Sequence, residues 1–427
     1  MSMKFDRIVL EGTDKIGKTT IVENLKYLGF DVSDRSINIS KNVKLPHNLT
    51  NENIENIKNE IINNSITLYV FIVYKDNKVA EQIKGIIDKS DKYDKDFDKY
   101  NQSYLKIVEK LNDFDNVLIL ERKVDTTPYE LVVEIIKKYL EDLKIEELPI
   151  TIEGESKIYR KVYNLNIAVA TLKPSVYSFT FKRYSIVEGT DVARNGIWEI
   201  IGSKLNISYN RFKFHNENYI VRLLNYYANG LMKFKKDIFV SNFLFKINDN
   251  TSLVVFENQI PNIEVVWKRK HVGTPKHKLI GVEKFKTRYG KVIKPEGLYP
   301  NPVIRFDWRN PVEHDEKTGE LIDKGDEAIA DEFADFYIDT QHSKILTNYV
   351  SWWLFHYFDS YGLELVDLCY FQNENADRIH SEITPDGMRL KLKDEHKDMD
   401  KDLWRKGADK SVLKDRWMEL LNIIKNS

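Results

Sequence analysis

The sequence has a single cysteine, Cys369, among its 427 residues, so no disulfide can form within the chain and no cluster of cysteine thiolates can hold a metal. It contains no apolar run near the roughly 20 residues that are needed to span a bilayer. It also begins without a charged and then apolar leader, so we expect no signal peptide. These absences predict a protein of a reducing, cytoplasmic compartment with no membrane partner.

The sequence also lacks an excess of charge of either sign. Lys and Arg number 65 against 66 Asp and Glu, which gives a net charge of -1. Nonspecific binding to a nucleic-acid backbone depends on an excess of positive charge, so the composition gives no strong nucleic-acid signal. The length favours two or three domains rather than one. The composition assigns no oligomeric state.

Residues 1–148 alternate between strand and helix patterns. Strands are expected at 8–10, 30–32, 65–74 and 117–121, and helices at 19–28, 78–88, 97–111 and 129–143. Such alternation predicts a parallel sheet that is covered by helices on both faces. Residues 144–149 have the composition of a linker.

Residues 149–427 follow a different pattern, in which strands and helices are segregated. Strands are expected within 151–181, 238–256 and 263–266, and helices at 191–205, 216–232 and 326–361. The Gly-, Pro- and charge-rich stretch 286–321 is predicted to be an extended loop. This pattern predicts a larger α+β domain.

A phosphate-binding pattern, G-x-x-x-x-G-K-[ST], occupies the segment from Gly12 to Thr19 between a predicted strand and a predicted helix. Gly12 and Gly17 allow the backbone to wrap around phosphate oxygens, and the helix N-terminus adds a partial positive charge. We expect Lys18 to reach the β- and γ-phosphates of ATP, and the Thr19 hydroxyl to bind Mg²⁺. The alternative is a glycine turn that only starts a helix.

The run from Leu10 to Thr20, which includes Asp14 and Lys15, resembles the opening of thymidylate kinases. The resemblance implies a shortened P-loop kinase fold that binds ATP through this run. The pair Asp34-Arg35 is similar to the Asp-Arg motif of that family, which implies that Asp34 helps to place Mg²⁺ and that Arg35 contacts the acceptor phosphate. The alternative for this pair is a surface ion pair after a strand.

The sequence departs from the thymidylate kinase pattern in two places. The nucleoside-binding middle of that family is missing between Arg35 and Ser65. The family's lid supplies arginines, whereas the corresponding run here offers only Lys89, Lys92 and Lys95, which cannot make the same bidentate contact. That run also fits a solvated charged helix.

Several segments beyond residue 149 resemble SAICAR synthetase (phosphoribosylaminoimidazole-succinocarboxamide synthetase) in the order of that family. They are Gly154–Lys157, Ile263–Arg269, Glu313–Glu316, Gly362–Asp367, Glu382–Leu390 and Asp400–Arg405. The resemblance implies an α+β SAICAR synthetase-like domain over 149–427. Each segment is short, and the ordered set carries the resemblance.

The resemblance also implies roles for individual residues. Lys157 would face ATP, and the residues implied to bind a phosphorylated nucleotide substrate are Lys268, His314, Asp315, Glu382, Asp386, Arg389, Lys401 and Arg405. Cations of this kind stabilise phosphates and the charge that develops when ATP phosphorylates a carboxylate. The alternatives are a tight turn at Thr384–Gly387 and a surface pair at His314-Asp315.

Three residues break the SAICAR synthetase pattern at positions that serve metal and ATP in that family. Phe371 and Ser381 stand where the family has carboxylates, and Glu155 stands where it has a lysine. Mg²⁺ prefers carboxylate oxygens, so these changes weaken the expected metal site. Glu374 or Asp377 would compensate if the register were shifted.

Three functions fit these residues. The interpretation that we place first is a nucleotide enzyme whose P-loop domain phosphorylates a nucleoside monophosphate or a related hydroxyl, with a second domain that recognises a nucleotide. The second is an ATP-dependent amide ligase that joins an amino acid to a nucleotide carboxylate, with an accessory P-loop domain. The third is a nucleotide-controlled binding protein without turnover. All three imply a small-molecule nucleotide partner.

Overall fold

The computed structural model describes residues 3–12, 17–34, 50–76, 97–178, 183–215, 238–273, 279–310, 313–314, 321–322 and 325–426. The chain divides into two compact units. Unit 1 consists of Met1–Leu148 with two short later segments, Val162–Asn166 and Lys236–Ile238, and unit 2 consists of the rest. No helix in the described ranges combines the length and the apolar character that crossing a bilayer requires.

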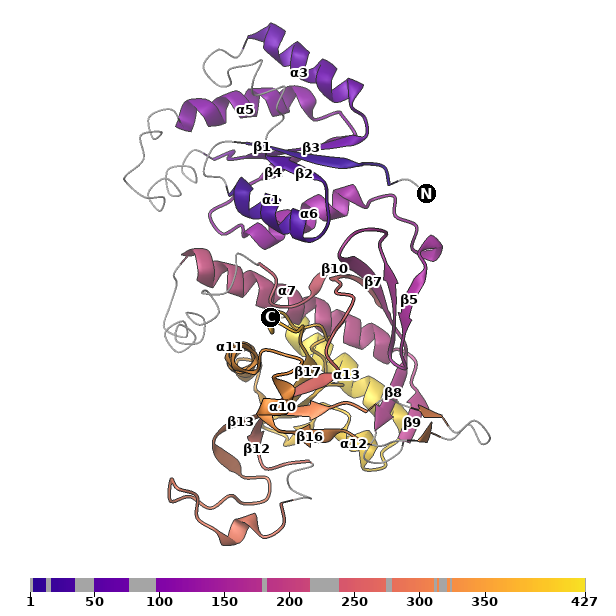
Figure 1. Ribbon diagram of the computed structural model, residues 1–427, viewed down its shortest axis with the longest axis vertical. Helices are drawn as coiled ribbons and strands as arrows, with labels where there is room; N and C mark the ends of the chain where they lie inside the picture. Colours follow the sequence, from indigo (N-terminus) through magenta and orange to yellow (C-terminus); the bar gives the residue numbers. More distant parts are fainter. Residues whose placement is uncertain are drawn as a thin grey trace. The chain divides into compact units, whose positions relative to one another are not determined.

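Unit 1 is built on a parallel four-stranded sheet in the order β2-β1-β3-β4. The strands are β1 (Arg7–Gly12), β2 (Val32–Asp34), β3 (Thr67–Val73) and β4 (Val117–Glu121). The helices are α1 (Lys18–Tyr27), α3 (Asn51–Asn63), α5 (Phe97–Leu111) and α6 (Pro128–Tyr139). Figure 1 shows α3 and α5 on one face of the sheet and α1 and α6 on the other. The predicted sheet with helices on both faces is confirmed.

Local sequence explains several of these elements. All seven residues of β3 are buried, as expected for a strand that is covered on both faces. Helix α6 begins with a capping box, in which Thr127 and Glu130 satisfy each other's backbone N–H groups, and Pro128 occupies the first turn. Helix α3 was not predicted. Because it lies between Arg35 and Ser65, that segment contributes a helix to the fold. The predicted helix at 78–88 lies outside the described residues.

The described residues of unit 2 form two antiparallel sheets and two short hairpins. The five-stranded sheet has the order β10-β11-β7-β6-β5, and the six-stranded sheet has the order β16-β13-β12-β17-β18-β19. The strands are β5 (Ile150–Glu153), β6 (Lys157–Lys161), β7 (Ile167–Leu172), β8 (Ser175–Ser178), β9 (Arg183–Ile186), β10 (Phe243–Asn248), β11 (Thr251–Val255), β12 (Ile263–Lys270), β13 (Leu298–Trp308), β14 (Glu313–His314), β15 (Leu321–Ile322), β16 (Glu327–Ile329), β17 (Leu363–Phe371), β18 (Met388–Leu392) and β19 (Lys397–Asp398).

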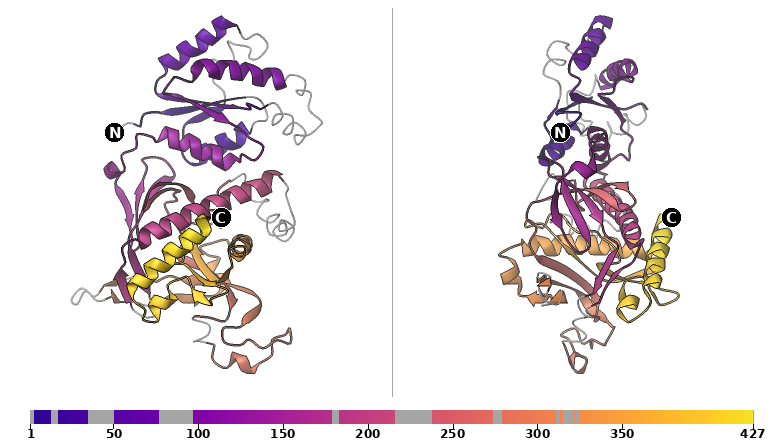
Figure 2. Two further views of the ribbon diagram at one scale, coloured as in Figure 1. Left: turned by 180° about the vertical axis from the view of Figure 1, so that it is seen from behind. Right: turned by 90° about the vertical axis from the view of Figure 1, so that its right-hand side faces the viewer.

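The helices of unit 2 are α7 (Thr190–His215), α10 (Asp331–Ala334), α11 (Thr340–Asp359), α12 (Asp402–Arg405) and α13 (Lys410–Lys425). Helices α7 and α13 lie side by side, and α11 packs on the six-stranded sheet against β12 and β17 (Figure 2). The buried side chains of Trp267, Phe306 and Tyr370 belong to the core that α11 helps to form. Alternate residues of the same strands point to the opposite face of the sheet, which carries the charged groups described below.

Two predictions for unit 2 are wrong. A single helix was predicted at 326–361, but this stretch contains β16, α10 and α11. Asp339 ends the intervening turn and caps α11, because its side chain accepts a 2.8 Å hydrogen bond from the His342 N–H. The predicted loop at 286–321 contains β13, which pairs with β12 along most of its length. The predicted helix at 216–232 lies outside the described residues.

Candidate functional site

The phosphate-loop pattern of unit 1 begins at Gly12, the last residue of β1. In the sheet, β1 lies between β2 and β3. Gly17 adopts a positive φ of 92° directly before α1, a conformation that favours glycine. Lys18 is buried, and its Nζ atom donates a 2.8 Å hydrogen bond to the Gly12 carbonyl. The ammonium group therefore lies against the backbone of Gly12, the first glycine of the pattern.

The other predicted residues of unit 1 lie at the same edge of the sheet or outside the described residues. Asp34 is the last residue of β2 and pairs in register with Leu10 of β1. Thr19 is exposed and Thr20 is partly buried in the first turn of α1. Asp14, Lys15, Arg35, Lys89, Lys92 and Lys95 lie outside the described residues.

Arg122 is a residue of this edge that the sequence interpretation missed. It follows β4, where its N–H donates to the Val73 carbonyl at 2.9 Å. A Cβ atom on Gly17 would lie only 2.7 Å from Arg122 Nη1, so the guanidinium lies against the start of α1. Burial lowers the pKa of Arg122 below its usual value. No local sequence pattern indicates this contact, because it depends on the order of the strands in the sheet.

The charged face of the six-stranded sheet in unit 2 holds a row of three side chains on neighbouring strands. Lys268 of β12 and Arg389 of β18 both lie opposite Asp367 of β17. The Asp367 Oδ2 atom lies 2.5 Å from Lys268 Nζ and 2.6 Å from Arg389 Nη1. Burial alone would raise the pKa of Asp367, but the two cations outweigh it and lower the pKa. Strand register thus fixes a carboxylate between two cations.

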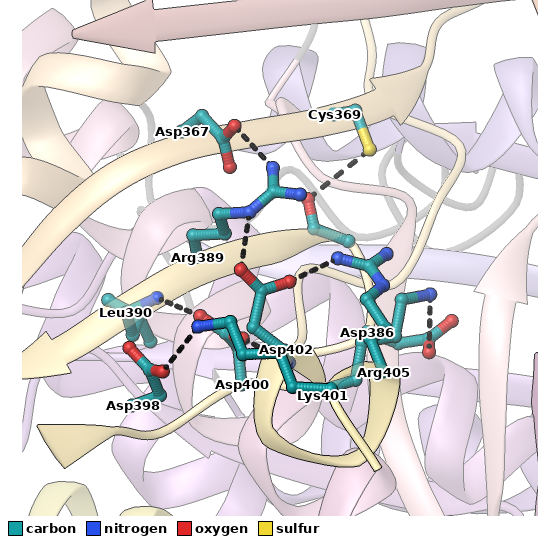
Figure 3. A network of polar contacts seen from close by, with 12 residues as sticks. Asp367, Cys369, Asp386, Arg389, Leu390, Asp398, Asp400, Lys401, Asp402 and Arg405 are labelled. Atoms are coloured by element: carbon teal, nitrogen blue, oxygen red, sulfur yellow. Dashed lines mark hydrogen bonds and ion pairs between the residues drawn. The ribbon is translucent and has the colours of Figure 1, made fainter. Parts of the chain in front are cut away.

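A second acidic group extends this row, as Figure 3 shows. Asp402 accepts from Arg389 Nε at 3.0 Å and from Arg405 Nη1 at 2.6 Å. Asp400 accepts from two backbone N–H groups, those of Leu390 at 3.0 Å and Asp402 at 2.6 Å. Burial and the neighbouring Asp402 charge raise the pKa of Asp400 to about 7. The short helix α12 and the residues before it therefore lie against β18.

The Pro-Asp-Gly turn brings Asp386 to the same place. A Cβ atom on Gly387 would lie 2.9 Å from the Cys369 carbonyl, so only glycine allows the turn to approach β17 this closely. Lys401 Nζ donates to Asp386 Oδ1 at 3.0 Å. Burial would raise the pKa of Asp386, but Lys401 and Arg194 outweigh it and hold the pKa at about 2.

A separate buried cluster joins the start of β6 to the segment before the turn. Lys157 forms an ion pair with Glu382, and Arg194 of α7 lies 3.8 Å from the same carboxylate, between Nη1 and Oε1. The Arg194 side chain is fully buried. Sequence interpretation missed Arg194, and its place within an otherwise ordinary helical pattern gave no signal.

The remaining predicted residues are placed less completely. His314 lies in the two-residue strand β14 and pairs with Leu321, whereas its side chain and Asp315 lie outside the described residues. The Ser381 Oγ atom accepts from the Phe371 N–H at 2.9 Å, so the two departures from the expected carboxylates lie next to each other. Within the described residues no group of three or more His, Cys, Asp or Glu side chains could hold a metal.

Comparison with known proteins concerns mainly the second unit. The SAICAR synthetase family model matches residues 209–420. "Bifunctional cordycepin biosynthesis cluster protein 3" of Cordyceps militaris is 24% identical over 317 residues, which are 64% of this chain and 32% of that protein. The chain therefore spans about a third of the length of this curated relative.

The solved structures with similarity include SAICAR synthetases. The phosphoribosylaminoimidazole-succinocarboxamide synthase of Ehrlichia chaffeensis is 19% identical, with 65% of this chain and 98% of that chain covered and a TM-score of 0.46. A SAICAR synthetase in complex with ADP is 17% identical, with 65% and 97% covered and a TM-score of 0.43.

The family-model match lies outside residues 1–148, so the thymidylate kinase-like interpretation of unit 1 stays a prediction. The matched stretch contains the charged strands β12, β17 and β18 together with Asp386, Lys401 and Arg405. Residues 209–420 of this chain therefore form a domain similar to SAICAR synthetase.

Proposed function

We propose that unit 2 is an ATP-dependent ligase that joins an amine to the carboxylate of a phosphorylated nucleotide. In this reaction ATP phosphorylates the carboxylate, which gives ADP and an acyl phosphate. The amine nitrogen then attacks the acyl carbon, phosphate leaves, and the nitrogen loses a proton to give the amide. The match to the SAICAR synthetase family favours this function over the kinase that the sequence interpretation placed first.

The network around Asp367 and Asp402 is the observation that carries the proposal. It holds Lys268, Arg389 and Arg405 in fixed positions through ion pairs of 2.5 to 3.0 Å. Cations that are already positioned stabilise phosphate groups and developing negative charge without reorganisation during the reaction. We infer that these cations, with Lys401, bind the phosphate and carboxylate groups of the nucleotide substrate.

The opposite end of the site would bind ATP. Lys157 lies on the first hairpin of the five-stranded sheet and is held there by Glu382. Mg²⁺ in phosphoryl-transfer sites is usually bound by one or two carboxylates together with the phosphates of the nucleotide. With Phe371 and Ser381 in place of carboxylates, Glu382 would be a carboxylate ligand of this end for the Mg²⁺ of Mg·ATP. The small number of protein ligands fits a metal that arrives with its nucleotide.

A second activity is proposed for unit 1. The Lys18–Gly12 contact and the positive φ of Gly17 support binding of a nucleoside triphosphate at the end of β1, with Thr19 and Asp34 available to Mg²⁺. Transfer of a phosphoryl group from this site to a nucleoside monophosphate or a related hydroxyl is the second candidate function.

The test measures ADP release from ATP and Mg²⁺ with a panel of imidazole carboxylate nucleotides and nucleoside monophosphates, each with and without aspartate and other amino acids. The parent chain is compared with Lys18→Ala and Arg389→Ala. The ligase proposal expects turnover that requires both a nucleotide carboxylate and an amine, survives Lys18→Ala and is lost in Arg389→Ala.

Two outcomes would contradict the ligase. Turnover that needs no amine and disappears in Lys18→Ala would place the activity in unit 1 and support the kinase. Tight binding of ATP and a panel nucleotide without ADP release would instead favour the nucleotide-controlled binding protein. Folding of each variant is checked by its thermal unfolding temperature.

A further inference from the structure

Among the described residues of unit 2, two arginines, Arg194 and Arg378, have completely buried side chains. Arg378 is paired with an acidic side chain and with a backbone carbonyl. Its Nη1 donates to Glu257 Oε1 at 3.0 Å, and its Nε donates to the Phe239 carbonyl at 3.3 Å. A buried guanidinium normally needs such partners, because each unmet donor costs free energy in a site that water cannot reach. Arg378 thus defines what a structural buried arginine looks like in this protein.

Arg194, unlike Arg378, has only part of its guanidinium group hydrogen-bonded. Its Nη2 donates to the Lys173 carbonyl, but within the described part of the chain Nε and Nη1 have no hydrogen-bond partner. The Glu382 carboxylate, which is already paired with Lys157, lies 3.8 Å from Nη1 and is beyond hydrogen-bonding distance. Two donors of a buried, planar cation are therefore available to a ligand.

The position of Arg194 indicates which ligand. Its Nη1 atom lies 3.8 Å from the carboxylate of the Lys157–Glu382 pair, at the end of the site proposed for ATP. Its positive charge also favours ionisation of the Asp386 carboxyl, at the end proposed for the nucleotide substrate. A phosphoryl group that passes from ATP to a carboxylate must cross the region between these two ends.

We infer that Arg194 binds the terminal phosphoryl group of a nucleoside triphosphate through its Nε and Nη1 donors. Guanidinium offers a planar, forked set of donors that matches phosphate oxygens, and such charge-assisted hydrogen bonds are strong in a buried site. The inference rests on the proposed ligase function and adds a residue to it. Arg194 lies outside residues 209–420, so the family match does not assign it this role.

The test compares the affinity of unit 2 for ADP with its affinity for a non-hydrolysable ATP analogue, adenylyl imidodiphosphate, by isothermal titration calorimetry. Every protein carries Lys18→Ala, so that differences between variants report on unit 2. The variants are Arg194→Lys and Arg194→Met, and the matched control is Arg378→Lys. We expect the parent to bind the analogue more tightly than ADP, and both Arg194 variants to lose about 10- to 100-fold of analogue affinity with little change for ADP.

Stability separates a ligand role from a structural one. Because Arg194 has donors without partners, Arg194→Met should lower the unfolding temperature of the ligand-free protein less than Arg378→Met does. The stabilisation that the analogue gives beyond that given by ADP should be present in the parent and absent in Arg194→Met. Arg378→Lys, if folded, should keep the parent's ratio of analogue to ADP affinity.

The possible contradictions are distinct. Equal losses of ADP and analogue affinity in both Arg194 variants would make Arg194 a structural residue and overturn the inference, while the ATP site would stand. Unchanged affinity for both ADP and the analogue in both Arg194 variants would show that Arg194 does not contact the terminal phosphoryl group, and would also overturn the inference. Failure of unit 2 to bind either nucleotide would overturn the proposed function together with the inference.

Discussion

Arg389 lies opposite Asp367 on the neighbouring strand, and its Nη1 atom donates a 2.6 Å hydrogen bond to the buried Asp367 Oδ2 atom. Lys268 approaches the same oxygen from the strand on the other side, at 2.5 Å. The carboxylate therefore holds two cations on one face of the sheet. Removing it would leave the buried Lys268 and the partly buried Arg389 without their common partner.

The first prediction concerns the stability of this arrangement. Asp367→Asn should lower the free energy of unfolding of unit 2 by about 3–5 kcal/mol, because breaking a buried ion pair leaves an uncompensated charge. Urea unfolding followed by tryptophan fluorescence measures the change. Asp359→Asn is the control: its partner is Lys393, both side chains are 40% or more exposed, and a loss of less than about 1 kcal/mol is expected. Equal losses in the two variants would show that the buried pair has no special role.

The second prediction concerns catalysis. Arg389→Lys keeps a positive charge but cannot contact Asp367 and Asp402 with two sides of one planar group. We expect the amine-dependent ADP release to fall by roughly 10- to 100-fold in kcat/KM, which corresponds to the loss of one charge-assisted hydrogen bond. Lys393→Arg, a change on the exposed end of the same strand region, should leave kcat/KM within about twofold. Full activity in Arg389→Lys would argue that charge alone matters at this position.

Local sequence patterns account for part of the arrangement of the charged residues in unit 2. The Pro-Asp-Gly turn and the strand that follows place Asp386 and Arg389 at fixed spacing, and the strand register then brings Lys268 to the same sheet face. Arg194 could not be found in this way, because nothing in a helix sequence shows that a side chain will be buried with some of its donors unpaired. Arg122 was missed for a related reason, since its contact with Gly17 depends on the order of strands in the sheet.

Two errors in the fold have equally specific causes. The stretch from 326 to 361 is apolar and aromatic at helical spacing over its second half, and this pattern was extended too far toward the N-terminus. Asp335 and Asp339 both bond to the first turn of α11, which shows where the helix begins. The Pro and Gly residues in and near β13 led to the prediction of a loop. The alternation of apolar and polar residues that is typical of a strand starts only after Pro302.

The third prediction tests the phosphate loop of unit 1. Gly17→Ala places a Cβ atom at a φ of 92° and 2.7 Å from Arg122 Nη1, so both backbone strain and a close contact oppose it. Titration with the ATP analogue and Mg²⁺ should find two nucleotide sites in the parent chain and one in Gly17→Ala. Gly407→Ala is the control, because Gly407 has a φ of 108° but no atom within 4 Å of the added Cβ. It should be strained yet retain both sites, and loss of a site in both variants would contradict the prediction.

The fourth prediction concerns pH and Asp400. Burial, with the nearby charge of Asp402, raises the pKa of Asp400 to about 7 in the folded protein, whereas an unfolded aspartate titrates near ~4. Between these values the folded state binds more protons than the unfolded state, so this group stabilises the protein fully below pH ~4 and the stabilisation is lost as the pH rises to about 7. Asp386, whose pKa is held at about 2, acts in the opposite sense and only in more acidic solution.

The measurement compares unfolding temperatures from pH 4 to 7 for the parent chain and Asp400→Asn. The parent should lose stability across this range more steeply than the variant, because asparagine cannot release the proton. When the data are expressed as the free energy of unfolding against pH, the slopes of the two proteins should differ by at most the equivalent of one bound proton. Asp359→Asn, which changes an exposed carboxylate, should keep the slope of the parent. A parent whose slope equals that of Asp400→Asn would mean that the two backbone hydrogen bonds to Asp400 keep its carboxylate ionised despite burial, and the charge balance around Arg389 would then contain one more negative group.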